Sequence, residues 1–363
     1  MSRGAGRGVV ILLLCGLALP NRAAAEPYLA IQQGYKCDAC HVNPTGGGLR
    51  NDFGAVFTQN VLPQNTLPAR FPAWTGTLFT PLQVGADWRW ADSTTVVPAQ
   101  GSTKQSGVEQ LRAYGNLAVI PSYLTYYVDE QLDPGQPLAL EYYARLSDPA
   151  HGLYLKAGQF YLPFGWRLQD NTAFVREFSG IGMTTPDKGF ELGFERPEWS
   201  AQLDYTRGEA NISTGSGHEI TTELVHVLSQ WRVGAAASFT QSTLGNREVQ
   251  GLFAARRTGP VAWLGEVDLV RDAGFPGNPR RMLAALGEAD WALAKGQNLK
   301  LTGEYADPDL SVVNDQETRW SLVYEYTPIP FLQVRAGFRR YRGIPQNDLE
   351  NRRLLFLEIH AFL

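Results

Sequence analysis

The residues best suited to chemistry lie close together near the N-terminus. Cys37 and Cys40 are separated by two residues, and His41 follows the second cysteine directly. This spacing is typical of covalent c-type haem attachment: the two thiols add to the two vinyl groups of the porphyrin, and the adjacent imidazole faces the iron. We therefore predict one covalent haem c held by Cys37 and Cys40, with His41 as the proximal iron ligand. A backbone carbonyl of the glycine-rich stretch 44–48 is expected to accept the second N–H of the imidazole.

A zinc site and a redox dithiol fit the cysteine pair less well. A structural zinc site needs four ligands, and the chain has no second close pair of cysteines. A redox dithiol of the thioredoxin type belongs to a βαβ pattern, which this sequence lacks. Haem attachment is therefore the favoured interpretation.

The sixth iron ligand is not evident near the motif. Between Glu26 and Trp74 there is no methionine and no histidine other than His41. A segment of about fifty residues buries little apolar surface alone, so we expect the rest of the chain to complete the haem crevice, or one side of it to stay open. Met183 is the candidate distal ligand, although packing in a loop is the simpler interpretation of that residue. The remaining histidines also compete for the role, and each is more simply an ordinary polar residue: His151, His218, His226 and His360.

The first 25 residues have the features of a cleaved signal peptide. Arg3 and Arg7 precede an apolar run at 9–19, and alanines at 23–25 fit a cleavage site before Glu26. Cys15 lies inside the apolar run without a small residue before it, which argues against lipidation. The mature chain is therefore expected to be exported and to begin near Glu26. The formal net charge of the full 363-residue sequence is −4, which gives no sign of a nucleic-acid partner.

Short alternating segments fill the chain from about residue 76 to the C-terminus. In the stretch 82–90, LQVGADWRW, the apolar residues share one face and Gln83, Asp87 and Arg89 share the other. Similar segments of about ten residues recur, separated by Gly, Pro, Asp and Asn, and carry aromatic residues at their ends. This pattern predicts a membrane-spanning barrel of about sixteen antiparallel strands. No apolar run approaches the roughly eighteen residues of a membrane helix.

The longest interruption of this pattern, at 162–189, is expected to fold into the barrel and narrow the lumen. The charged face of the strands is expected to hydrate the pore and guide ions. It includes Arg112, Arg145, Lys156, Glu191, Glu266 and Arg335. No catalytic triad, paired-carboxylate or phosphate-loop pattern is present, so no catalytic residue is predicted.

The order of these features resembles the fused monohaem cytochrome–porin family, to which outer-membrane iron-oxidising cytochromes belong. The specific motif is Cys37-Asp38-Ala39-Cys40-His41, and the rest of the likeness is one of architecture. The resemblance implies a haem in or at one mouth of the barrel. It also implies electron transfer between an external metal ion or small-molecule redox partner and periplasmic electron-carrier proteins. Whether the chain is an oxidoreductase acting on extracellular iron or an electron carrier is left open, with the carrier favoured.

The predicted fold is all-β: an antiparallel outer-membrane β-barrel at 76–363, preceded by a signal peptide at 1–25 and a short monohaem cytochrome segment at 26–75. The expected location is the outer membrane of a Gram-negative bacterium. Two alternative functions stay open. One is a diffusion porin whose haem is a plug or sensor, and the other is a haem enzyme with an open sixth iron position.

Overall fold

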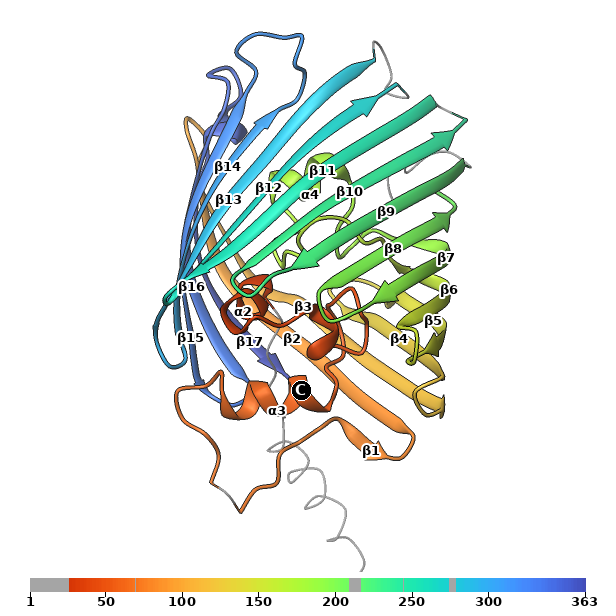
Figure 1. Cartoon of the computed structure of the whole chain (residues 1–363). Coiled ribbons are helices and arrows are strands. Elements are labelled where there is room, and N and C mark those ends of the chain that lie inside the picture. The colour runs from red at the N-terminus through yellow and green to blue at the C-terminus, as the bar shows by residue number, and fades with distance from the viewer. Residues whose placement is uncertain (1–25, 69, 209–216, 244, 274–278) are drawn as a thin grey trace, which may run out of the picture.

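The computed structural model describes residues 26–68, 70–208, 217–243, 245–273 and 279–363. The predicted signal peptide lies outside these residues. In the described part of the chain, none of the helices is long and apolar enough to cross a membrane. Most of the described residues belong to one antiparallel sheet (Figure 1).

The sheet closes into a barrel because its last strand pairs with its first long strand. Each strand from β2 to β17 pairs antiparallel with the next along the chain, and β17 returns to β2 through pairs such as Glu358 with Ala91. The strands of the ring are β2 (Leu82–Val97), β3 (Gly101–Ile120), β4 (Leu124–Asp133), β5 (Leu138–Asp148), β6 (Leu153–Tyr161), β7 (Pro186–Glu195), β8 (Trp199–Thr206), β9 (Gly217–Val227), β10 (Trp231–Ser242), β11 (Gly245–Thr258), β12 (Val261–Asp272), β13 (Arg280–Ala294), β14 (Gln297–Asp307), β15 (Glu317–Ile329), β16 (Leu332–Arg342) and β17 (Arg353–Phe362).

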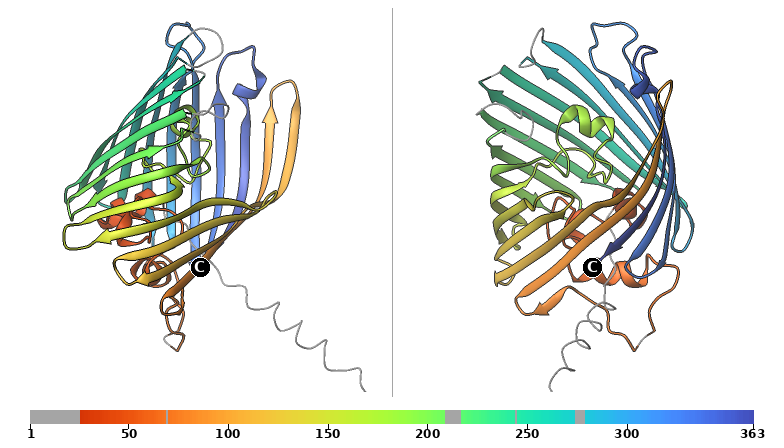
Figure 2. Two further views of the ribbon diagram at one scale, coloured as in Figure 1. Left: turned by 90° about the vertical axis from the view of Figure 1, so that its right-hand side faces the viewer. Right: turned by 180° about the vertical axis from the view of Figure 1, so that it is seen from behind.

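The predicted barrel and its sixteen strands are therefore confirmed. A further short strand, β1 (Thr77–Phe79), lies outside the ring and pairs with the start of β2. The strands β2 and β3 are longer than the expected ten residues, at 16 and 20 residues. Their hairpin extends beyond β4 at one end of the barrel, whereas β17 follows β2 as far as Val96 (Figure 2).

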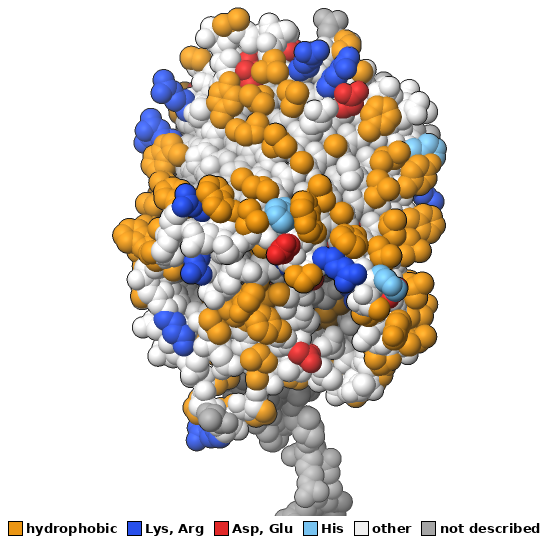
Figure 3. Space-filling model, viewed as in Figure 1, with side chains coloured by type: hydrophobic (Ala, Val, Ile, Leu, Met, Phe, Trp, Pro, Cys, Tyr) orange, Lys and Arg blue, Asp and Glu red, His pale blue; other side chains and the backbone are white. Residues whose placement is uncertain are grey.

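Apolar side chains face out of the barrel and polar side chains face in, as the alternation predicted. On the outer face Leu252 is 68% exposed and Phe190 is 58% exposed, whereas the inward Lys156 and Glu191 are fully buried. Hydrophobic side chains are the most frequent coloured type on the strand-covered face in Figure 3. This inversion of the usual burial pattern fits a lipid environment, where a closed barrel leaves no unpaired strand edge.

The two ends of the barrel differ in the length of their connections. At the end that holds the C-terminus the turns are short, such as 259–260, 295–296 and 330–331. At the opposite end the connections include 162–185, 308–316 and 343–352. Outer-membrane barrels carry short periplasmic turns and longer extracellular loops. The short-turn end is therefore assigned to the periplasm.

The N-terminal segment lies inside the barrel toward the short-turn end (Figures 1 and 2). We call residues 26–65 the plug. It contains α2 (Pro27–Gln33), the 3₁₀ turn η1 (Cys37–Ala39) and α3 (Asp52–Asn60). Its end is tied to the end of β15 by the amides of Gln64 and Asn65, which donate to the carbonyls of Thr327 and Pro328.

The connection 162–185 folds into the lumen from the opposite end, as predicted, and we call it the inward loop. It contains the short helix α4 (Phe174–Ser179), which packs against β12, β13 and β14. Leu162, Trp166 and Val175 of this loop are buried. The inward loop meets the plug through Arg167, whose guanidinium donates to the carbonyl and hydroxyl oxygens of Thr45.

Candidate haem-attachment site

The cysteine motif adopts a single tight turn. The backbone amides of Cys40 and His41 both donate to the carbonyl of Cys37, at 3.1 and 3.0 Å. Both cysteines are free thiols and half-buried. The turn therefore places two thiols and one imidazole on a compact stretch of backbone, the arrangement that haem attachment requires.

A hairpin follows the motif and brings residue 50 beside the histidine. The amide of Asn51 donates to the carbonyl of Cys40, and His41 forms a β-bridge with Arg50. The hairpin turns back at 43–46, where the amide of Gly46 donates to the carbonyl of Asn43 at 2.9 Å. Gly46 has φ +90°, and a Cβ there would lie 3.3 Å from the Cys37 sulfur. Glycine therefore leaves the space beside this thiol open.

Helix α3 is held directly against the motif. The side-chain amide of Asn51 donates to the carbonyls of Asp38 and Ala39, and its oxygen caps the helix by accepting from the amide of Gly54. A Cβ on Gly54 would clash with the carbonyl oxygen of Cys40. Asn51 and Gly54 thus fix the motif on the first turn of α3.

A cavity that is partly open to solvent lies beside the motif, with an empty volume of about 1100 Å³ that includes the solvent at its mouth. Cys37, Cys40 and His41 line it from the plug, and Trp166 and Arg167 line it from the inward loop. The barrel wall completes the lining with residues of β7 to β11. These wall residues include Glu195, Ser200, Gln202, Glu223, Val225, Val227, Arg232 and Phe253. Residues from the rest of the chain therefore complete the walls of this cavity, and its role as a haem crevice stays a prediction.

His41 is a buried polar side chain without a hydrogen-bond partner. It is 5% exposed, and neither ring nitrogen makes a hydrogen bond to the described residues. The predicted hydrogen bond from the imidazole to a carbonyl of the glycine-rich stretch is therefore absent. The backbone at 47–49 lies close to the ring and acts to raise its pKa, but its geometry is not that of a hydrogen bond. Burial has the larger effect and, together with the positive charge of Arg50, lowers the pKa of His41 to about 3. The imidazole is thus neutral and can offer a lone pair.

The two thiols are also in their neutral form. Burial raises the pKa of Cys37, and burial together with the neighbouring Cys37 raises the pKa of Cys40 to about 11. Thioether formation adds the sulfur and the proton of a thiol across a vinyl double bond, whereas structural zinc binds thiolates. Free thiols, an unpartnered neutral imidazole and a large cavity all fit a covalently bound haem, so the residues present suit the predicted cofactor.

Met183 lies in a neighbouring, smaller cavity. That cavity measures about 490 Å³ and shares His41, Gly47 and Arg50 with the larger one. A Cβ on Gly47 would lie 2.9 Å from the terminal methyl of Met183. Met183 therefore packs beside the glycine-rich stretch and does not line the cavity that holds the two cysteines. Its distal role stays a prediction.

The other histidines lie elsewhere on the barrel. His360 is buried and lies 3.0 Å from Asp87, while His151 contacts Asp148 in an exposed turn. His218 and His226 stack on outer aromatic rings, those of Tyr205 and Trp199. None of the four lines the large cavity.

Charged residues of the lumen wall are engaged by the plug and the inward loop. Lys156 donates to Asn43 of the plug at 2.9 Å and pairs with Glu191 at 2.7 Å. All six side chains that were expected to hydrate the pore have protein partners. The pairs are Arg112 with Tyr161, Arg145 with Val42, Lys156 with Glu191, Glu266 with Arg176, and Arg335 with Glu325. They anchor the lumen segments instead of facing an unobstructed channel.

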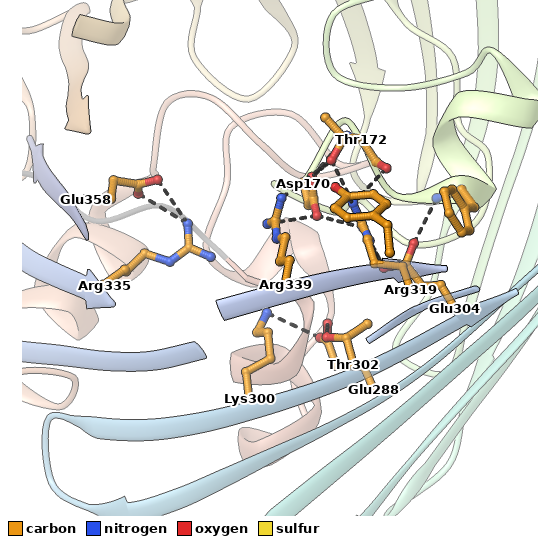
Figure 4. Close-up of polar contacts among 12 residues, drawn as sticks. Asp170, Thr172, Glu288, Lys300, Thr302, Glu304, Arg319, Arg335, Arg339 and Glu358 are labelled. Carbon is orange, nitrogen blue, oxygen red and sulfur yellow. Dashed lines mark hydrogen bonds and ion pairs between the residues drawn. The ribbon is translucent and has the colours of Figure 1, made fainter. Parts of the chain in front are cut away.

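A second set of ion pairs fixes the inward loop (Figure 4). Asp170 of the loop lies 2.9 Å from both Arg319 and Arg339, and Arg319 also pairs with Glu304. These guanidiniums hold the pKa of the Asp170 carboxyl well below its usual range, against the effect of burial. The same wall also binds the start of the plug, where Glu26 pairs with Lys300 at 2.7 Å.

Sequence reasoning missed the residues that hold the plug in place. Asn43, Arg50 and Asn51 are buried or half-buried polar residues within ten positions of His41. A signal was available, because polar residues that follow a haem motif closely must find partners inside the crevice. The partners of Asn43 and Arg50 on distant strands were not readable from the chain, whereas those of Asn51 lie within the plug.

The closed ring, the apolar outer surface and the two unequal ends define a porin-like outer-membrane β-barrel, and its location is the outer membrane of a Gram-negative bacterium, as predicted. No known protein family matches the chain, and no curated protein sequence matches it.

Solved porin structures share the barrel fold. An anion-selective porin from Comamonas acidovorans is 10% identical, with a TM-score of 0.63 over 78% of this chain and 99% of that chain. A loop-deletion mutant of OmpT, an outer-membrane protein of Vibrio cholerae, is 12% identical, with a TM-score of 0.59 over 78% and 99%. Pseudomonas putida OprB is 9% identical, with a TM-score of 0.60 over 78% and 94%. At these identities the likeness establishes the fold alone.

Proposed function

We propose that this barrel carries one covalent haem c on Cys37, Cys40 and His41 and passes electrons across the outer membrane. The observation that supports this function is a single cavity where two free, neutral thiols meet a buried imidazole without a hydrogen-bond partner. When bound, the haem accepts and releases one electron. The protein residues hold it, keep His41 neutral and exclude bulk water from it.

The position of the plug supports a role in crossing the bilayer. The hydrocarbon core is about 30 Å thick, which is too far for efficient direct electron transfer. The cavity lies between the plug and the barrel wall, and Trp166 and Arg167 of the inward loop contribute to its lining. A redox centre there divides the distance into shorter steps. The external metal ion or small-molecule redox partner reacts at the long-loop end, and periplasmic carriers react at the short-turn end.

An aromatic cluster connects the cavity to the periplasmic surface of the plug. Tyr35 and Phe57 line the cavity, and Phe53 packs against both rings, with its centroid 5.3 Å from Tyr35 and 6.3 Å from Phe57. Phe53 is 46% exposed. A periplasmic electron-carrier protein that contacts Phe53 is therefore separated from the cavity by the ring of Phe53 and the ring of Tyr35 or Phe57.

The filled lumen distinguishes this function from a diffusion porin. The plug enters from one end and the inward loop from the other, and Arg167 joins them through Thr45. A diffusion porin predicts solute conductance that survives loss of the haem, whereas an electron conduit predicts little conductance with the plug in place.

One observation favours a second candidate, a haem enzyme that binds a small ligand. Among the described residues, His41 is the one histidine that lines the large cavity, and no methionine lines it. The sixth iron position is then open or held by a weaker ligand. This candidate predicts a high-spin spectrum that shifts when carbon monoxide is added to the reduced protein.

The proposal is tested with purified protein and with proteoliposomes. We expect a c-type haem that survives acid–acetone extraction, and faster reduction of an enclosed redox dye by an external donor than with His41→Ala. His151→Ala, which changes an exposed histidine far from the cavity, is the matched control and should behave as the wild type. Colourless wild-type protein, or equal dye reduction by wild type and His41→Ala, would refute the conduit.

A further inference from the structure

Arg50 is a buried cation without an anion beside it. Its side chain is 8% exposed, and among the described residues it makes no ion pair and no side-chain hydrogen bond. Its guanidinium instead lies over the ring of Phe362, whose centroid is 5.1 Å from the guanidinium carbon. A buried charge is costly unless it is paired, so this arrangement calls for a further partner.

The nearest carboxylate of the wall is already engaged. Asp87 lies 3.0 Å from His360 and 3.4 Å from Arg89. Burial lowers the pKa of Arg50 to about 10, with Asp87 opposing that effect only in part. Arg50 therefore stays charged at neutral pH, while no carboxylate in the described part of the chain binds it directly.

The place of Arg50 identifies where its partner must lie. Arg50 and His41 lie between the two cavities and line both of them, and Cys37 and Cys40 line the larger one. The β-bridge to His41 fixes the backbone of Arg50 beside the imidazole. The other guanidiniums of that cavity are occupied by backbone carbonyls, because Arg167 donates to Thr45 and Arg232 to Tyr35. Among the described residues, Arg50 is thus the cation in the lining of the large cavity that has no polar partner.

We propose that Arg50 binds a carboxylate of the group that occupies the large cavity, which is a propionate of the covalent haem. This inference rests on the proposed function. A guanidinium suits the role because it forms two parallel hydrogen bonds to one carboxylate and keeps its charge. Pairing with the propionate satisfies the charges of both groups in a site that is shielded from water.

The experiment compares Arg50→Gln with the wild-type holoprotein. Removal of a positive charge near the iron favours the oxidised haem, so the equilibrium with a redox dye of fixed potential should shift about tenfold toward oxidised protein. Resonance Raman spectra should show a shift of the propionate bending band. Arg50→Lys keeps the positive charge, so its redox equilibrium should return most of the way to that of the wild type. Its propionate bending band should stay shifted. It also serves as the test variant if Arg50→Gln does not accumulate.

Arg145→Gln is the matched control. Arg145 also binds the plug, through the carbonyl of Val42 at 2.6 Å, but it does not line the large cavity. Its redox equilibrium and propionate band should equal those of the wild type. An unchanged equilibrium and band in haem-loaded Arg50→Gln would overturn the role of Arg50 and leave the proposed function intact.

A free anion at Arg50 is distinguished by titration with sulfate. If an inorganic anion occupies the site, sulfate will shift the redox equilibrium of the wild type and leave Arg50→Gln unaffected, which would overturn the propionate assignment. Wild-type protein that carries no haem would overturn the proposed function as well as this inference.

Discussion

Asn43 is the residue through which the plug can be loosened most selectively. It is fully buried, accepts a hydrogen bond from the ammonium of Lys156 at 2.9 Å and donates to the carboxylate of Glu141 at 3.3 Å. Both partners belong to the barrel wall. The substitution Asn43→Ala therefore removes two links between plug and wall and leaves the barrel strands unchanged. It also removes the bonds that Asn43 accepts from the amide and hydroxyl of Thr45 within the plug.

The size of the effect follows from the charge of the two partners. A hydrogen bond to a charged group contributes about 1.5–3 kcal/mol, so the loss of two costs at least about 3 kcal/mol. Every 1.4 kcal/mol is a factor of ten in an equilibrium constant, so the population with the plug undocked should rise about a hundredfold. Lys156 keeps Glu191 as a partner, so the barrel itself should remain stable.

Hydrogen exchange measures this population directly, because amides protected by docking exchange in proportion to the opened fraction. We expect amides of the hairpin 40–51 to exchange about a hundredfold faster in Asn43→Ala. Amides of the barrel strands should be unaffected. Asn60→Ala is the control, since the side chain of the exposed Asn60 bonds, among the described residues, only to Val56 within its own helix. Unchanged protection of the hairpin in Asn43→Ala would refute the view that these two bonds hold the plug.

Three further predictions concern the site. Met183→Leu should leave the optical spectrum of the haem-loaded protein unchanged, because Met183 does not line the cavity of the cysteines. Gly54→Ala should reduce covalent haem content, because the new methyl clashes with the carbonyl of Cys40. Burial raises the pKa of Glu26, but Lys300 and Arg335 outweigh it and hold that pKa below 4.5. The pairing therefore contributes stability above pH 4.5 that is lost as the pH falls through the lowered value, and ion conductance in planar bilayers should rise there.

Each of these predictions has an outcome that contradicts it. Loss of a low-spin spectrum in Met183→Leu would make Met183 a ligand after all. Full haem loading of Gly54→Ala, measured as pyridine haemochrome, would show that α3 can shift away from the motif. Glu26→Gln removes the titrating group, so a rise in conductance of equal size in that variant would assign the acid response to other residues.

The sequence alone determined the barrel and the candidate cofactor residues. Period-two alternation identifies a strand because successive side chains point to opposite faces, and it sets register because a slip by one residue would turn the apolar set away from lipid. All sixteen ring strands fall within a few residues of the alternating segments. Cys37, Cys40 and His41 were also readable, because their spacing is a local property of the chain.

The tertiary structure alone decided what surrounds those residues. The partners of Asn43 lie on β5 and β6, and the wall of the large cavity comes from β7 to β11 and the inward loop. These contacts join positions about a hundred or more residues apart, and no local pattern encodes them. The same closure placed Met183 beside the glycine-rich stretch and left Arg50 without an ion pair among the described residues, because the path of the loop within the lumen depends on charges contributed by many strands.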